Sequence, residues 1–255
     1  MLWYKAWLET RWRFLIGLAL LLCSAAAVVF TYPKVVQLMP MVSRTDTGGL
    51  LGERIREAAE MARTYRGYAW SQWFSQNLAN TWTLFAVLLG TGGLLAQASG
   101  GAALFTLSLP VSRAELVRVR ALTGLAELLV LAVVPSLLLP VLSPAVGQSY
   151  GVSDAIVHSL CLFAAGTVFF SLAFLLSTVF TDIWRPFLMV LFLSMVLGIV
   201  EQLFRDQLPF GIFRVMSADS YFKSVGIPWL GLLATAALSA AMLYGAAINI
   251  SRRDF

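Results

Sequence analysis

Charged residues are scarce in this sequence, and their scarcity excludes the most common class of protein. Only 12% of the 255 residues are charged and 59% are hydrophobic, whereas about a quarter of the residues in a typical soluble domain are charged. The mean hydropathy is +0.81. A chain of this composition cannot present a water-compatible surface, so a soluble globular protein is excluded and an integral membrane protein is expected.

Cysteine and histidine are also rare, which argues against disulfides and metal sites. The two cysteines, Cys23 and Cys161, lie inside apolar runs, where we expect each to be a small buried hydrophobic residue. The single histidine, His158, cannot supply the ligands of a metal or haem site. The net charge of +5 comes from basic residues scattered at the ends of apolar runs. That placement is typical of contacts with lipid phosphates and argues against nucleic acid as a partner.

Common catalytic motifs are absent as well. The sequence has no phosphate-binding glycine loop, no Gly-x-Ser-x-Gly elbow and no His-Glu-x-x-His pair. The ionisable residues inside apolar runs are Glu127, His158 and Glu201, and they lie in different runs without an obvious partner. We therefore expect no catalytic site, metal or cofactor in this chain. Glu127 is expected to be either a functional site or a hydrogen-bonded structural residue, and His158 to be an interfacial residue.

Six apolar runs are candidates to cross a bilayer, which takes about 20 residues in a helix. They predict an all-α polytopic membrane protein with one transmembrane domain and spans at residues 14–32, 78–96, 121–142, 155–180, 187–204 and 226–250. An even number of spans places both termini on one side. The connections on the two sides contain equal numbers of basic residues, but those on the side of the termini are shorter. Their higher density of positive charge favours cytoplasmic termini.

Two segments outside the predicted spans have an amphipathic pattern. Met1–Arg13 combines Trp3 and Trp7 with basic residues, which predicts an N-terminal interfacial helix. Residues 48–69 have apolar positions three and four apart with charged residues on the other faces, which predicts a helix on the outer membrane surface. This helix is either a lip for substrate entry or a solvated packing helix. Aromatic residues from Tyr65 to Phe74 then predict an interfacial belt.

The connection between the second and third predicted spans, residues 97–120, has an ordered pattern. After a Ser-Gly-Gly break, residues 102–109 are apolar but too short to span, and Pro110 ends them. Ser112 and Glu115 then have the spacing of a capping box, which starts a new helix. The pattern predicts a stiff broken elbow at the membrane surface, able to transmit force from a partner into the third span.

The stretch from Leu107 to Arg113, Leu-Ser-Leu-Pro-Val-Ser-Arg, resembles the elbow of ABC-2 family permeases of ATP-binding-cassette transporters. The terminal Arg-Arg-Asp-Phe, residues 252–255, also resembles the ending of many members. The family usually has a glutamate at the start of the elbow, where this chain has Gln97. The resemblance implies that the residues contacting the ATPase are Gln97, Leu107, Pro110, Ser112, Arg113 and Glu115.

The resemblance implies a permease subunit of an ATP-driven exporter in a bacterial-type inner membrane. Such a permease pairs with a second permease chain, the same or related, and with two cytoplasmic ATPase subunits that bind ATP and magnesium. Closure of the ATPase pair would push on residues 102–109, and Pro110 and Ser112 would pass the motion to the third span. The lack of intramembrane charge clusters favours a hydrophobic or amphipathic substrate, such as a lipid, peptide or drug.

Three other functions are compatible with the sequence alone. A stand-alone secondary transporter or channel would work without ATP, but the halves on either side of Pro144 lack the matching broken helices of inverted repeats. A polytopic membrane enzyme would use Glu127 or His158 in catalysis. A non-transporting assembly or sensor subunit would bind an ATPase without moving a substrate.

Overall fold

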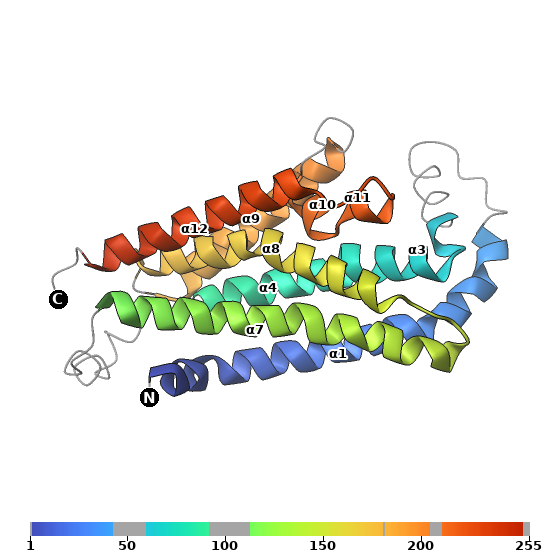
Figure 1. Cartoon of the computed structure of the whole chain (residues 1–255), viewed down its shortest axis with the longest axis horizontal. Coiled ribbons are helices and arrows are strands. Elements are labelled where there is room, and N and C mark those ends of the chain that lie inside the picture. Colours follow the sequence, from blue (N-terminus) through green and yellow to red (C-terminus); the bar gives the residue numbers. More distant parts are fainter. Residues whose placement is uncertain (1, 43–59, 92–112, 181, 205–210, 252–255) are drawn as a thin grey trace.

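The computed structural model of the chain describes residues 2–42, 60–91, 113–180, 182–204 and 211–251, and these residues form helices without any strand. Five helices are long and apolar enough to cross a membrane, as expected of a multi-pass membrane protein. They are α1 (Leu2–Val42), α7 (Arg113–Leu142), α8 (Val152–Ser177), α9 (Trp184–Leu203) and α12 (Trp229–Ser251). The start of α1 and the end of α12 lie at the same end of the bundle (Figure 1).

Helix α1 is longer than the span predicted at residues 14–32. It runs without a break from Leu2 to Val42, so the predicted N-terminal interfacial segment is the first part of the same helix. The predicted span ends before Pro33, and this end is wrong because α1 continues through the proline. A proline inside a helix removes a local backbone hydrogen bond, and membrane helices tolerate that loss. Cys23 is exposed on α1 and Cys161 is buried in α8, so the expected burial is confirmed for Cys161 alone.

Between α1 and α7 the chain returns along the bundle in three consecutive helical pieces. They are α3 (Tyr65–Ala69), the π-helical η1 (Trp70–Leu78) and α4 (Ala79–Gly90), and Figure 1 shows α4 beside α7 and α8. The predicted span at residues 78–96 is not among the five long apolar helices, because α4 has 12 residues and residues 92–112 lie outside the described part of the chain. A sixth span is therefore not confirmed.

The predicted outer helix, residues 48–69, falls largely outside the described residues. Its described part, from Glu60 onward, is interrupted before Tyr65, and the Thr64 hydroxyl caps α3 by accepting a hydrogen bond from the Gly67 amide. A single amphipathic helix ending at Ala69 is therefore not what the structure shows. Tyr65 instead belongs to the helical run that enters the bundle.

The aromatic residues that the sequence suggested as an interfacial belt lie in the core. Tyr65, Tyr68, Trp70, Trp73 and Phe74 are all buried. Their polar groups reach partners inside the bundle: the Tyr68 hydroxyl donates to the Val28 carbonyl and the Trp70 indole to the Ser217 carbonyl. Because these polar groups are satisfied, tyrosine and tryptophan are buried without the usual penalty. Hydropathy patterns cannot distinguish this arrangement from a belt.

Helix α8 lies at the centre of the bundle and packs against α4, α7 and α12. Glycines allow the close approach: a Cβ on Gly166 would lie 2.3 Å from the Trp82 ring, and one on Gly124 would lie 2.7 Å from the Phe170 ring. The buried Trp82 indole also donates to the Leu128 carbonyl on α7 at 3.0 Å. Short helices occupy two connections, namely η2 (Ser143–Val146), α10 (Ile212–Met216) and α11 (Asp219–Phe222).

The contact between α4 and α8 predicts that Gly90 cannot be enlarged. A Cβ on Gly90 would lie 2.7 Å from the backbone oxygen of Phe170, whereas one on Gly245 of α12 would meet the Leu175 side chain at 3.7 Å. Both alanine substitutions gain similar helix propensity. We expect Gly90→Ala to lower the free energy of unfolding by about 1–3 kcal/mol relative to Gly245→Ala, because a backbone atom cannot move aside cheaply. Unfolding of the purified chain by dodecyl sulfate in mixed micelles measures this, and equal stabilities would contradict it.

Candidate functional site

Most residues of the predicted ATPase contact lie outside the described part of the chain. Gln97, Leu107, Pro110 and Ser112 fall within residues 92–112. Helix α7 begins at Arg113, directly after the predicted cap, and Glu115 is in its first turn. The Glu115 carboxylate lies 3.9 Å from the Arg118 guanidinium, and both side chains are well exposed. The predicted cap residue, Ser112, lies outside the described residues, so the capping box and the elbow both stay predictions.

A group of polar side chains joins α1 to α7 near the N-terminal end of the bundle. We call it the α1–α7 polar cluster, and its members are Glu9, Thr10, Arg13, Arg120 and Glu127. The Arg120 guanidinium lies 3.1 Å from the Glu9 carboxylate, and the Thr10 hydroxyl donates a hydrogen bond to a Glu127 carboxylate oxygen. Arg13 donates to the Leu88 carbonyl at 3.0 Å, which ties α4 to the same cluster. Three helices are thus held together by charged or polar contacts.

Helical spacing explains how these residues meet. Arg13 follows Thr10 by three residues and Glu9 by four on α1, and Arg120 and Glu127 are two turns apart on α7, so each set lies on one side of its helix. Glu127 is 5% exposed and Arg120 is 9% exposed. The Glu127 side chain therefore lies inside the bundle and does not extend to the lipid headgroups. The spacing of these residues along each helix is visible in the sequence, but the sequence does not show that α1 and α7 pack against each other.

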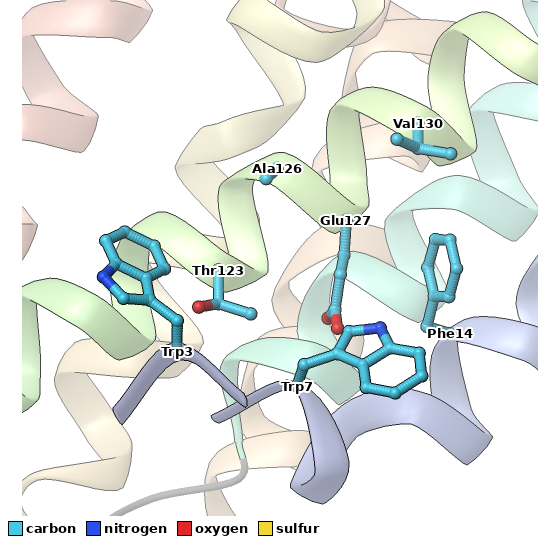
Figure 2. Close-up of a pocket in the computed structure, with 7 residues that line it drawn as sticks. All are labelled: Trp3, Trp7, Phe14, Thr123, Ala126, Glu127 and Val130. Carbon is cyan, nitrogen blue, oxygen red and sulfur yellow. The ribbon is translucent and has the colours of Figure 1, made fainter. Parts of the chain in front are cut away.

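A pocket opens beside this cluster, between the first turns of α1 and the first half of α7. It has a volume of about 310 Å³ and is lined by Trp3, Trp7, Phe14, Thr123, Ala126, Glu127 and Val130. Figure 2 shows the Glu127 side chain extending from α7 toward Trp7 on α1. Three aromatic side chains and one carboxylate therefore face a single cavity. The sequence pattern of Trp3 and Trp7 predicts an interfacial helix and contains no signal for this pocket.

The other two intramembrane candidates hold the short helix α10 from its two ends. The Glu201 carboxylate accepts hydrogen bonds from the Phe213 amide in the first turn of α10, at 3.0 and 3.2 Å. His158 Nδ1 lies 3.0 Å from the carbonyl of Ser217, the C-cap residue of α10. Because a carbonyl can only accept, Nδ1 carries the proton. Both residues satisfy free backbone groups of a helix end, which is a structural task.

A second polar group lies at the opposite end of the bundle from the α1–α7 polar cluster. Asp154, in the first turn of α8, forms an ion pair with Arg66 at 3.1 Å and accepts a hydrogen bond from the Tyr221 hydroxyl at 2.8 Å. These contacts hold α3, α8 and the α11 segment together. Burial raises the pKa of the neighbouring Tyr150, so its hydroxyl stays protonated. We interpret this group as a structural one that holds the helices together at this end of the bundle.

The intramembrane candidates therefore do not form one site. Glu127 belongs to the α1–α7 polar cluster, whereas His158 and Glu201 bind the two ends of α10. Within the described residues, no group of three or more histidine, cysteine, aspartate or glutamate side chains is placed to hold a metal ion. In the described part of the chain, the pocket at Glu127 is one place where a charged side chain borders a cavity large enough for a small ligand group.

Comparison of the chain with protein-family models, curated proteins and solved structures gives no match. Two features of the chain bear on its function: the sequence of the elbow that precedes α7, and the cluster and pocket that join α7 to α1.

The partly buried ion pair between Glu9 and Arg120 predicts a measurable coupling between two side chains. Glu9→Gln leaves the buried Arg120 guanidinium without its counter-charge, and we expect it to cost about 2–3 kcal/mol of unfolding free energy. Arg120→Met leaves the Glu9 carboxylate in contact with solvent, and we expect it to cost less. The double variant should cost less than the sum. A double-mutant cycle, measured by dodecyl sulfate unfolding, gives the coupling energy.

The chain offers a matched control for this cycle. Arg185 and Asp182 form an ion pair of the same 3.1 Å length, but their side chains are 73% and 39% exposed, against 10% and 25% for Arg120 and Glu9. An exposed pair contributes about 0–1 kcal/mol, so its coupling should be the smaller of the two. Equal coupling in the two pairs would show that burial does not strengthen the Glu9–Arg120 contact.

Proposed function

We propose that this chain is the membrane-spanning permease subunit of an ATP-driven transporter of the ABC-2 type, exporting a hydrophobic or amphipathic substrate. Two separate cytoplasmic ATPase subunits hydrolyse ATP, and a second permease chain completes the route across the membrane. The observation that carries the proposal is the motif from Leu107 to Arg113. It stands directly before α7, a helix that packs against α1, α4 and α8.

The proposal includes a sixth membrane crossing by the run α3–η1–α4. Helices α1 and α7 both start at the end of the bundle where α12 finishes (Figure 1). The chain must therefore return to that end between Val42 and Arg113, and the consecutive helices from Tyr65 to Gly90 follow that direction. Six crossings place both termini and the elbow on one side, which we assign to the cytoplasm from the density of basic residues.

The contacts of α7 support a mechanism in which the elbow drives several helices together. A push on residues 102–109 would reach α7 first. Helix α7 is tied to α1 by Arg120 and Glu127 and to α4 by the Trp82 indole. Displacement of α7 would carry α1 and α4 with it as a packed group, which is the kind of rigid-body motion used by alternating-access transporters.

The separation of the intramembrane polar residues disfavours the enzyme alternative. An active site needs convergent groups around one cavity, whereas Glu127, His158 and Glu201 each bind a local partner in the described structure. The assembly or sensor alternative differs from the proposal only in whether a substrate moves. Transport measurements in the assembled complex separate those two.

Association with an ATPase tests the proposal directly. The chain is co-expressed with the ATP-binding-cassette ATPase encoded nearest to it, and copurification, ATP hydrolysis and transport are measured after reconstitution in lipid. We expect a stable complex whose hydrolysis is coupled to transport. Pro110→Leu and Arg113→Glu should reduce transport per ATP hydrolysed, because they disrupt the elbow and its charge next to α7.

A matched charge reversal separates an elbow effect from a general effect of surface charge. Arg185→Glu changes an exposed arginine at the start of α9, at the same end of the bundle, and should leave coupling unchanged. Failure to bind any ATPase would refute the proposed class. Normal coupling in both elbow variants would refute the coupling role while leaving the complex intact.

The sixth crossing predicts opposite accessibility of two exposed positions. Single cysteines replace Glu60 or Arg118 in a chain whose Cys23 and Cys161 are changed to alanine. A membrane-impermeant maleimide added to intact cells should label Glu60→Cys and should not label Arg118→Cys until the membrane is opened. Labelling of both from the same side would show that no crossing lies between them.

A further inference from the structure

We propose that the pocket between α1 and α7 binds the ammonium group of an amphipathic amine. The cavity of about 310 Å³ lies beside the α1–α7 polar cluster and has Glu127 as the single charged residue in its lining (Figure 2). This binding would be a property of the isolated chain. It goes beyond the proposed transport function and does not depend on an ATPase partner.

One carboxylate oxygen of Glu127 lacks a hydrogen-bond partner. Glu127 is 5% exposed, and only one of its oxygens accepts a hydrogen bond, from Thr10. The other oxygen, Oε2, is buried and has no partner among the described residues. A buried carboxylate that lacks a partner is costly, so a cation supplied by a ligand would stabilise it.

The neighbouring arginines, Arg120 and Arg13, make their close contacts with groups other than Glu127. Arg120 pairs with Glu9 at 3.1 Å, and Arg13 donates to the Leu88 carbonyl at 3.0 Å. Neither arginine lines the pocket, and no described lysine or arginine forms an ion pair with Glu127. The ionisable group in the lining is therefore an acid, and in its ionised form it selects a cation over a phosphate or carboxylate.

The pocket lining includes aromatic side chains. Trp3 and Trp7 border the cavity and are 53% and 40% exposed, so their ring faces are available to a ligand. Indole faces attract cations, and aromatic cages combined with a carboxylate are suited to alkylammonium groups. A small metal ion would instead need several oxygen ligands, whereas this lining offers Glu127 and the Thr123 hydroxyl beside apolar surface.

The rest of the lining fits a hydrocarbon chain attached to the ammonium group. Phe14 and Val130 supply apolar surface, and Ala126 and Val130 are exposed on the outer side of α7. An amphiphile can therefore enter from the side of the bundle, with its charged end toward Glu127 and its chain along the helices. The source is either a membrane lipid with an ammonium headgroup or a free amphipathic amine.

Binding is tested on the purified chain in a neutral maltoside detergent. Isothermal titration with hexyltrimethylammonium should show saturable binding, and hexyl sulfate should not bind at the same concentrations. We expect Glu127→Gln to weaken hexyltrimethylammonium binding roughly tenfold or more, because the carboxylate charge is lost while the Thr10 hydroxyl still has an amide oxygen to donate to. Trp7→Leu should weaken it roughly threefold to fivefold through the lost cation–π contact.

A third variant keeps the charge and removes the space. Ala126→Phe fills the opening from an exposed position on α7, away from the packed core, and should abolish binding with Glu127 intact. Two controls should bind like the wild type: Glu60→Gln, an exposed acid at the opposite end, and Trp12→Leu, a 65% exposed tryptophan of α1 outside the pocket. Melting temperatures in detergent establish that all variants are folded.

Native mass spectrometry separates the two sources of the amine. Phosphatidylcholine and phosphatidylethanolamine are compared with phosphatidylglycerol of identical acyl chains. Loss of the first two lipids, but not the third, in Glu127→Gln identifies a bound membrane lipid. Lipid binding that is the same in all variants, together with Glu127-dependent binding of hexyltrimethylammonium, identifies a free amine.

The proposal is overturned if hexyl sulfate binds as tightly as hexyltrimethylammonium. It is also overturned if the Glu127→Gln and Ala126→Phe variants both bind the ammonium probe like the wild type. Because the assay uses the permease chain alone, its failure leaves the ATPase association untouched. A missing ATPase partner likewise leaves the pocket assay valid.

Discussion

Burying polar side chains among apolar helices is costly unless each finds a partner, and this cost determines how the ends of the bundle are built. At one end Arg120 finds Glu9, and Thr10 donates to Glu127. Toward the other end, the indole of Trp70 and the imidazole of His158 both contact the Ser217 carbonyl. Each contact joins segments far apart in the sequence. The polar residues thus determine which helices meet.

The middle of the bundle depends on size instead of charge. Lipid chains are as apolar as leucine, so helices in a membrane associate through close packing more than through the hydrophobic effect. A Cβ on Gly124 or Gly166 would collide with the ring of Phe170 or Trp82, and one on Gly90 would collide with the backbone of α8. The buried Trp82 combines both strategies, since its ring packs against Gly166 and its indole N–H binds the Leu128 carbonyl. Helix α8 is consequently surrounded on most of its faces.

Hydropathy was enough to locate the long helices, because the free energy of transferring an apolar run into lipid depends on the residues of that run alone. It placed the spans at 155–180, 187–204 and 226–250 within three residues of the ends of a helix, and the span at 121–142 inside the longer α7. Hydropathy failed where contacts with other helices decide whether a segment lies in the core or at the membrane surface. The aromatic residues from Tyr65 to Phe74 have the composition of a belt, yet their bonds to Val28 and Ser217 make them core.

The same reason explains what the sequence could and could not say of the site. Glu127 stood out because a carboxylate in an apolar run needs an explanation, but its partner Thr10 lies on another helix, and no local pattern pairs the two. Trp3 and Trp7 fit an interfacial anchor equally well with or without a pocket. The role predicted for the elbow residues is supported by the sequence alone.

Helix α7 connects the two proposed sites, and the contacts between α7 and α1 decide how they influence each other. The pocket has walls from both helices, so it would open or close if α7 slid along α1. The Glu9–Arg120 ion pair and the Thr10–Glu127 hydrogen bond oppose such sliding. A push from the elbow would therefore move α1 and α7 together and leave the pocket unchanged. A cavity that keeps its shape through a transport cycle suits a retained lipid headgroup better than a transported substrate, whose path must change its access from one side to the other.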